Sequence, residues 1–288
     1  MNATLGAGRP QPIPGLKHEV WICATCGVEH ADAEGTCAIC ADERQWVPAG
    51  GQRWTTLGEL ERAGHRVCVE ELEADLFAIT TQPKVGIGQH AHLVRTPAGN
   101  LLWDPVGFVD EEAAARVRSL GPVRAIAASH PHMFGAQVQW SRALDGAPVL
   151  VCEPDAAWVR RPDPVIELWR GCRQVVPGLT LQQIGGHFPG SAVVHWPAGA
   201  DGRGVLLSSD TVQANPDRAT VTFLRSYPNR IPLSPAVVTR IARSLGRLTF
   251  DRLYDNVGGV IDGRAQVALA RSAERYCGWA RGDFDALT

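Results

Sequence analysis

Short apolar runs recur along the chain, and several of them end in a turn that carries a histidine or a carboxylate. Residues 123–128 lead into Ser-His-Pro-His, residues 101–103 end at Asp104, and residues 205–207 are followed by Ser-Ser-Asp. Runs of this length that stop at turn residues are typical of buried β-strands. The chain therefore places its reactive side chains at the ends of predicted strands.

Segments with helix-capping residues alternate with these strands. Asp110 and Ser234 stand at expected N-cap positions, and Pro235 suits the first helical position. Thr55 or Thr56, followed by Glu59, forms a capping-box pattern. The predicted helices span residues 56–63, 111–119, 134–144, 153–159, 234–245 and 262–279, with Asp262 as the cap of the last. Strands that alternate with helices predict helices packed against a sheet.

The chain has eight cysteines, and four of them form two Cys-x-x-Cys pairs separated by ten residues: Cys23, Cys26, Cys37 and Cys40. Two such pairs supply four thiolates in tetrahedral geometry. Without a metal, so short a segment has too few core residues to fold by itself. We expect a structural zinc here, with iron in a rubredoxin-like site as the alternative. The nearby His18 and His30 are expected to be surface residues.

A second set of metal-binding side chains is spread over three segments. His130 and His132 lie in one loop, His187 lies in a Gly-rich turn, and Asp210 follows the strand that begins at residue 205. Three imidazoles and one carboxylate form a suitable ligand set for zinc or iron. The alternative for the His-x-His pair by itself is two ordinary loop histidines.

The order of these segments resembles the metallo-β-lactamase superfamily. Its opening hairpin is similar to HLVRTPAGNLLWDPVG (92–107), and its His-x-His-x-Asp-His-x-Gly motif is similar to SHPHMFG (129–135). The segment with the third His resembles GGHFPGS (185–191), and the strand with the bridging Asp resembles LLSSDT (206–211). The resemblance covers most of the chain, roughly residues 69–276.

This resemblance implies an α+β fold, a four-layer αββα sandwich preceded by a small zinc ribbon. It also implies that Asp104 braces the loop that holds the His motif. The superfamily's second-metal ligands are missing, because Phe134 and Gly135 occupy the motif's Asp and His positions and the turn at 255–259 has no His. We therefore predict one metal, zinc or iron, in the His site.

The predicted organisation has four parts. Residues 1–15 form a flexible tail, 16–50 the four-Cys ribbon, 51–67 a connecting helix, and 68–288 the metallo-β-lactamase-like domain. A ribbon this small needs a neighbour, so we expect it to pack on the main domain or to mediate a homodimer.

Three functions agree with these residues. The first is water-mediated hydrolysis of an ester- or thioester-type small molecule, with Asp210 as a site carboxylate and Asp255 as a further catalytic candidate. The second is a non-catalytic or divergent metal-binding protein of the same fold. The third is a non-haem iron oxidoreductase, because superfamily sulfur dioxygenases resemble this site in using one iron at the positions of His130, His187 and Asp210.

The composition and charge of the chain argue against nucleic-acid and membrane partners. The formal net charge is −2 and the charged residues are spread out, so we expect no nucleic-acid partner. No apolar segment approaches the roughly 18 residues that a membrane-spanning helix needs, and the first residues lack an apolar signal segment. We expect a cytoplasmic protein. Among surface residues, Arg218, Arg225, Tyr227 and Arg230 are candidates for binding an anionic substrate.

Overall fold

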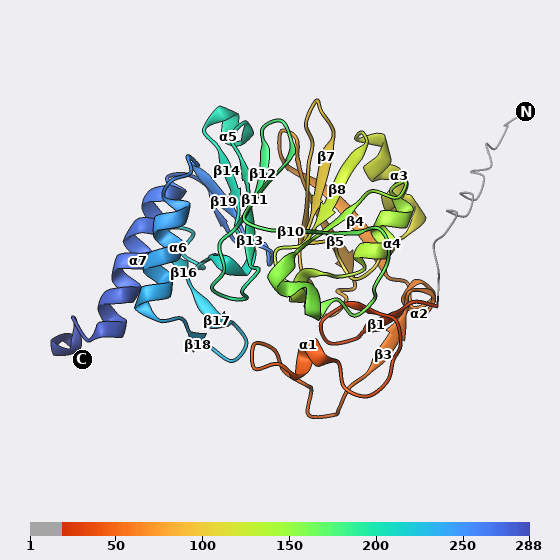
Figure 1. Cartoon of the computed structure of the whole chain (residues 1–288), viewed down its shortest axis with the longest axis horizontal. Coiled ribbons are helices and arrows are strands. Elements are labelled where there is room, and N and C mark those ends of the chain that lie inside the picture. The colour runs from red at the N-terminus through yellow and green to blue at the C-terminus, as the bar shows by residue number, and fades with distance from the viewer. Residues whose placement is uncertain (1–18) are drawn as a thin grey trace, which may run out of the picture.

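Two sheets pack face to face in the centre of the molecule (Figure 1). The structure is a computed structural model that describes residues 19–288. The first sheet has the order β10-β9-β8-β7-β6-β5-β4 and the second the order β11-β12-β13-β14-β19-β20. In the first sheet β4 to β7 are antiparallel, while β7, β8, β9 and β10 run parallel. Parallel neighbours place their carboxyl ends at one edge, where the functional loops lie.

The strands are short, and their bounds follow the apolar runs of the sequence. The first sheet consists of β4 (Arg66–Glu73), β5 (Leu76–Gln82), β6 (Ala91–Val94), β7 (Asn100–Trp103), β8 (Val123–Ala127), β9 (Val149–Cys152) and β10 (Ile166–Trp169). The second consists of β11 (Cys172–Val176), β12 (Leu179–Gln183), β13 (Ala192–Trp196), β14 (Val205–Leu207), β19 (Arg252–Tyr254) and β20 (Val260–Ile261). The smaller pairs are β15 (Gln213–Ala214) with β16 (Val221–Thr222), and β17 (Leu224–Ser226) with β18 (Ile231–Pro232).

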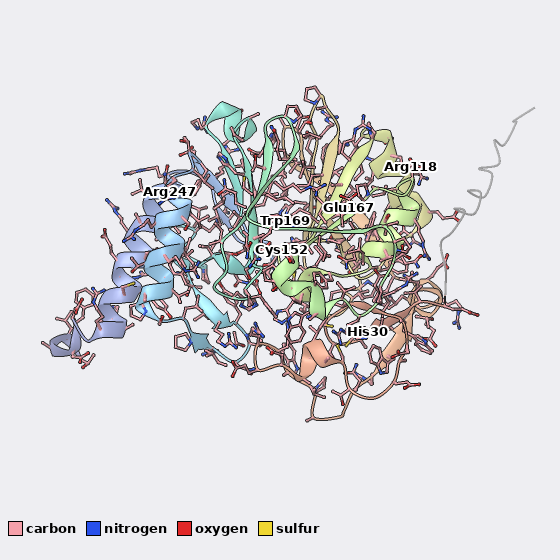
Figure 2. The ribbon with its side chains drawn as sticks, viewed as in Figure 1. His30, Arg118, Cys152, Glu167, Trp169 and Arg247 are labelled. Atoms are coloured by element: carbon pink, nitrogen blue, oxygen red, sulfur yellow. The ribbon has the colours of Figure 1, made fainter. Side chains whose placement is uncertain are left out.

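Helices cover the outer face of each sheet, which completes the expected αββα order. The helices α3 (Glu111–Ser119) and α4 (Gln137–Ala143) lie on the first sheet, and α6 (Pro235–Leu245) and α7 (Ala265–Arg281) on the second (Figure 1). The apolar cluster between the sheets includes Trp103 and Trp169, and Figure 2 shows Trp169 where the two halves meet. Removal of these side chains from water stabilises the sandwich.

The predicted caps are correct for three helices and wrong for one. Thr56 and Glu59 form a capping box at α2 (Leu57–Arg62), Asp110 caps α3 and Ser234 caps α6. The last helix begins at Ala265, and its N-cap residue is Arg264 rather than Asp262. Asp262 is wrong as a cap because the chain first turns through Arg264 at φ 55°, whose N–H bonds the Asp251 carboxylate.

Two other predicted helices are shorter than expected. The loop after β8 forms a 3₁₀ turn, η1 (Pro131–Met133), and α4 begins only at Gln137, because Gly135 adopts φ 49° between them. The stretch after β9 is a 3₁₀ helix, η2 (Glu153–Trp158), rather than an α-helix. The remaining short elements are α5 (Gly199–Gly202), η3 (Ser209–Thr211) and η4 (Asp285–Leu287).

The ribbon packs directly on the main domain. It contains β1 (Trp21–Cys23), β2 (Glu29–His30), α1 (Ala38–Ala41) and β3 (Trp54–Thr56), with sheet order β2-β1-β3. Its side chains Ile22, Val28 and Ile39 belong to the same apolar cluster as Phe134 and Trp140. Figure 1 shows the ribbon along the edge of the sandwich, beside the β17–β18 hairpin. The predicted tail at 1–15 lies outside the described residues. Within residues 19–288, no helix is both long and apolar enough to cross a membrane.

Substitution of Gly135 tests how tightly the loop that carries the His motif is packed. An added Cβ would lie 1.9 Å from the Pro105 carbonyl oxygen, and φ is positive. We expect Gly135→Ala to lower the free energy of unfolding by about 3 kcal/mol or more in urea titrations. The control Gly146→Ala also has positive φ but no neighbour within 4 Å, so it should cost only about 1 kcal/mol. Equal losses would show that the close approach to Pro105 is unimportant.

Candidate metal centre

Four side chains from three loops converge at one edge of the sandwich. His130 and His132 follow β8, His187 follows β12, and Asp210 follows β14. Their candidate ligand atoms all lie within 4.8 Å of one another. The three imidazoles are 1% exposed and Asp210 is 8% exposed. The structure therefore brings together all four residues that the sequence placed in the His site.

The spacing of the donor atoms fits a tetrahedral cation. His130 Nε2 and His187 Nε2 lie 3.3 and 3.4 Å from Asp210 Oδ2. His187 Nε2 lies 3.3 Å from His132 Nδ1. Ligand atoms placed tetrahedrally around zinc at about 2.0–2.1 Å are separated by about 3.3–3.4 Å. In addition, His130 Nε2 has no hydrogen-bond partner although it is buried, as expected for an atom that binds a metal.

Neighbouring groups fix the orientation of these ligands. Ser129 Oγ lies 2.8 Å from His130 Nδ1, and the Leu224 carbonyl oxygen lies 3.2 Å from His187 Nδ1. Gln213 Nε2 donates to Asp210 Oδ1 at 2.7 Å, which leaves Oδ2 directed at the imidazoles. Such partners fix the imidazole orientation and tautomer for metal binding.

Asp104 connects the two loops that carry ligands from different sheets. Its Oδ1 accepts the Ser129 N–H at 2.6 Å, and its Oδ2 accepts the Ser209 hydroxyl. Trp103 Nε1 donates to the same Ser209 oxygen at 3.2 Å. Asp104 is fully buried, and burial raises its pKa to about 6. These are the contacts that a brace between the His-x-His loop and the Asp210 loop requires.

Burial also sets the charge of the ligands. It lowers the pKa of His187 to about 3 and the pKa of His132 well below its usual value. Burial opposes ionisation of Asp210, but the neighbouring imidazoles, His130 first, hold the pKa of this carboxyl well below its usual range. Neutral imidazoles and an ionised carboxylate are the forms that bind a metal.

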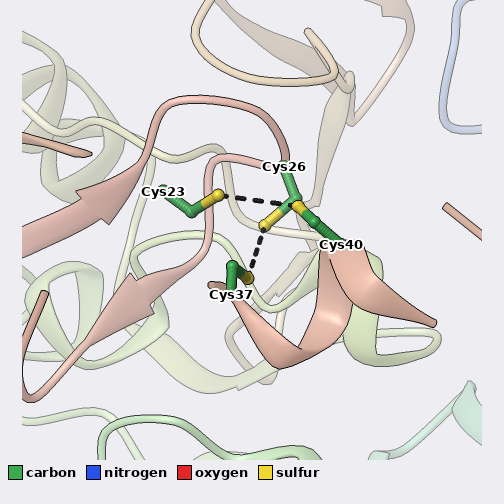
Figure 3. A group of neighbouring side chains, drawn as sticks. All are labelled: Cys23, Cys26, Cys37 and Cys40. Carbon is green, nitrogen blue, oxygen red and sulfur yellow. Dashed lines mark hydrogen bonds between the residues drawn. The ribbon is translucent and has the colours of Figure 1, made fainter. Parts of the chain in front are cut away.

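The four cysteines form a second group of converging ligands. Cys23 Sγ lies 3.6 Å from Cys40 Sγ, and Cys26 Sγ lies 3.9 Å from Cys37 Sγ (Figure 3). Thiolates around a tetrahedral zinc at about 2.3 Å are separated by about 3.8 Å. The thiols are buried, and no position in this closed set is left for a substrate.

His30 is not the surface residue that the sequence suggested. Its side chain is buried, with Nε2 3.4 Å from Cys37 Sγ and its ring 4.6 Å from that of Trp54. The label in Figure 2 places it inside the ribbon. Gln52 Nε2 makes a similar contact with Cys23 Sγ at 3.2 Å. His30 is buried because β2 directs its side chain toward the thiols. Metal ligands often have such a hydrogen-bonding partner beside them. His18 lies outside the described residues.

Comparison with known proteins places the chain in a family. No model of a known protein family matches it. It is 41% identical over 261 residues to the "Uncharacterized protein YmaE" of Bacillus subtilis (strain 168), covering 89% of this chain and 95% of YmaE. The chain belongs to the YmaE family. The two proteins therefore share a fold over most of their lengths. The name of YmaE assigns no activity.

Solved structures identify the fold of this YmaE relative. The metallo-β-lactamase DIM-1 superposes with a TM-score of 0.54 at 12% identity, covering 73% of this chain and 97% of DIM-1. The mono-zinc form of the metallo-β-lactamase FIM-1 from Pseudomonas aeruginosa superposes with a TM-score of 0.52 at 14% identity, covering 73% and 96%. The metallo-β-lactamase fold predicted from the motif order is confirmed.

The positions expected for a second metal hold groups that cannot bind one. Phe134 is buried in the apolar core, and Gly135 lies against the Pro105 carbonyl with no room for a side chain. In the turn at 255–259, Asn256 Nδ2 contacts Met133 Sδ at 3.0 Å. Among the described residues, no third group of His, Cys, Asp or Glu side chains converges as these two groups do.

Asp255 lies apart from the four ligands. Its Oδ1 accepts the N–H groups of Val257 and Gly259, and its Oδ2 accepts that of Ala214. Burial raises the pKa of this carboxyl. These bonds organise the turn after β19, and a role for Asp255 as a catalytic base stays a prediction.

His90 and His92 line a separate cavity of about 520 Å³ between the edges of the two sheets, with Tyr254 and Asp255. The four ligands of the His site are not part of its wall.

Of the residues suggested for an anionic substrate, Arg225 pairs with Glu43 of the ribbon at 2.5 Å. The Tyr227 hydroxyl donates to the Asp210 carbonyl at 3.2 Å, so Tyr227 supports the backbone of a ligand.

Sequence reasoning missed two residues beside the site. The Phe188 ring contacts all three imidazoles, with centroid distances of 4.9–5.6 Å. The guanidinium carbon of Arg44, in the ribbon, lies over the Phe188 ring, 3.6 Å from its centroid. The position of Phe188 beside His187 was a usable signal. Nothing in the local sequence joins Arg44 to a loop 143 residues away.

Asp104 gives a direct test of the brace. An amide at this position offers one acceptor where the carboxylate accepts from both Ser129 and Ser209, so one buried donor loses its partner. We expect Asp104→Asn to weaken zinc binding at the His site by about 10- to 100-fold, measured by competition with a chromophoric chelator. The control is Asp145→Asn, on an exposed loop. Equal affinities for both variants would contradict the bracing role.

Proposed function

We propose that this YmaE relative is a mononuclear zinc hydrolase that acts on an ester- or thioester-type small molecule, with a second, structural zinc in the ribbon. The observation that carries the proposal is the convergence of four donor atoms, from His130, His132, His187 and Asp210, within 4.8 Å of one another in a metallo-β-lactamase fold. Three of the donor pairs lie at the 3.3–3.4 Å separation of a tetrahedral zinc site. When bound, zinc in such a site polarises a carbonyl group and lowers the pKa of water to about 7.

The chain's own residues would set how a substrate approaches. Asp210 is the most exposed of the four ligands, so substrate is expected to enter on its side. Gln213 holds Asp210 Oδ1, and the Tyr227 hydroxyl holds the Asp210 backbone oxygen. Burial raises the pKa of Tyr227 well above its usual value, so this hydroxyl remains a donor at neutral pH. These bonds limit the movement of Asp210 during a reaction.

The convergence of four donor atoms also supports a second function, metal binding without catalysis. Four donors already complete a tetrahedral shell, and the three imidazoles are 1% exposed. If Asp210 remains bound to the metal and leaves no position for water or substrate, the site would hold its metal without catalysis, as structural zinc sites do. Under this alternative the protein is a metal-binding member of the fold without hydrolytic activity.

Metal content tests the number of sites. We expect two metal ions per wild-type chain and one in the double variant His130→Ala/His187→Ala, by elemental analysis of protein purified without added metal. The control His195→Ala changes an imidazole outside the cluster, one that contacts the Thr249 carbonyl, and should retain two. Three metals in the wild type would contradict a mononuclear His site, and one metal in both proteins would contradict a loaded His site.

Activity then separates the alternatives. With zinc in the His site, we expect hydrolysis of a panel of esters and thioesters, reduced at least 100-fold in the double variant and retained in His195→Ala. Two bound zinc ions without hydrolysis would favour the non-catalytic function. Iron in the His site, with oxygen consumption in the presence of thiols or persulfides, would favour the oxidoreductase alternative.

A further inference from the structure

We infer that the ribbon is part of the metal centre, and that Arg44 is the positioning residue through which it holds the His site in metal-binding geometry. This inference rests on the proposed function only in requiring that the His site binds a metal. It adds a role for a ribbon whose own four-Cys site has no position for a substrate.

Arg44 lies against the loop that carries the third histidine. Its Nη1 donates to the His187 carbonyl oxygen at 3.3 Å, and its guanidinium carbon lies 3.6 Å from the centroid of the Phe188 ring. The side chain is buried, and Trp158 covers it from a second side with the ring centroid 5.5 Å away. A cation above an aromatic face in a desolvated position is a favourable and geometrically specific contact.

Phe188 transmits this contact to the ligands. Its ring stacks on His130 at 5.6 Å and 26°, and meets His132 and His187 edge-on at 4.9 and 5.2 Å. A shift of this ring would therefore disturb all three imidazoles at once. Because buried rings pack without free space, Arg44 restricts Phe188 to the side of the imidazoles.

The ribbon metal site in turn fixes Arg44. Asp42 follows α1 directly and pairs with Arg44 through two bonds, Nε to Oδ1 at 2.5 Å and Nη2 to Oδ2 at 2.9 Å. Only one residue, Ala41, separates Asp42 from Cys40. This planar, two-point pairing sets the direction of the guanidinium, so the position of Arg44 depends on the loop that the cysteines organise.

The same ribbon loop also holds the strand behind His187. Ser226 Oγ donates to the Arg44 carbonyl at 3.1 Å, and Asn229 Nδ2 donates to the carbonyls of Glu43 and Gln45 at 2.8 Å. Ser226 ends β17, which begins at Leu224, whose carbonyl lies beside His187 Nδ1. The loop at 43–45 therefore contacts the surroundings of His187 in two ways, through the Arg44 side chain and through β17.

A separate part of the ribbon holds the His-x-His loop. The Glu29 N–H donates to the Gly135 carbonyl at 2.9 Å, and Glu29 Oε1 accepts the Val138 N–H at 2.5 Å at the start of α4. Arg161 pairs with the other oxygen of this buried carboxylate at 2.6 Å. The ribbon thus contacts both loops that supply imidazoles, one from each sheet.

The test uses the full-length protein with cobalt(II) in both sites, because thiolate and imidazole sites give different visible absorption. The variants are Arg44→Met, which removes the charge and the donors but keeps a long apolar side chain, and Arg44→Lys, which keeps the charge without the planar group. The matched control is Arg53→Met, also in the ribbon, where the arginine is exposed. Zinc affinity of the His site is measured in parallel by chelator competition.

We expect Arg44→Met to weaken zinc binding at the His site by at least tenfold and to shift the cobalt bands of that site, with the thiolate-to-cobalt bands unchanged. Arg44→Lys should recover part of both effects, and Arg53→Met should match the wild type. If Arg44→Met does not fold, Phe188→Leu, which removes the ring and keeps Arg44, should give the same loss.

Unchanged His-site bands and affinity within twofold of wild type in the folded Arg44 variant, or in Phe188→Leu, would overturn the inference while leaving the proposed function in place. A wild-type His site that takes up neither cobalt nor zinc would overturn the proposed function, and the positioning role of Arg44 with it.

Discussion

The metal centre depends on one buried carboxylate that joins the two halves of the sandwich. Asp104 directly follows β7 of the first sheet, accepts a backbone N–H from the His-x-His loop and accepts the hydroxyl of Ser209 beside Asp210. This link joins the loop of His130 to the loop of Asp210, which belong to different sheets, and so helps to set the spacing of these two side chains. A buried carboxylate is costly unless its oxygens are hydrogen-bonded, so both contacts must form together, and the donor atoms of the two loops meet at tetrahedral distances.

The ribbon adds a second constraint to the same centre. Its Glu29 bonds the loop after His132, and its Arg44 covers Phe188 beside His187. The ribbon lies at the same edge of the sandwich as the His site, beside the β17–β18 hairpin (Figure 1). A module that contacts both imidazole loops is suited to position the side chains of the His site.

The strands and the ribbon were predictable from local patterns, whereas the αββα fold was predictable from the resemblance of the motif order to the metallo-β-lactamase superfamily. Apolar runs that end near His130, Asp104 and Asp210 predicted the strands, and the spacing of the cysteines predicted the ribbon. Contacts across long sequence separations were not predictable in this way. Burial of His30 beside Cys37 depends on the direction in which β2 presents its side chain, the late start of α4 depends on positive φ at Gly135, and the contact of Arg44 with Phe188 exists only after the ribbon docks.

Zinc K-edge X-ray absorption of the zinc-loaded protein would test the central claim most directly. The account predicts two equally populated environments, one with four sulfur neighbours at about 2.3 Å and one with nitrogen and oxygen neighbours at about 2.0–2.1 Å. It also predicts no zinc–zinc scattering. A metal–metal distance of about 3.5–4 Å, typical of two-metal sites, would contradict a single metal at the His site. A purely sulfur environment would show that the four converging ligands do not hold zinc.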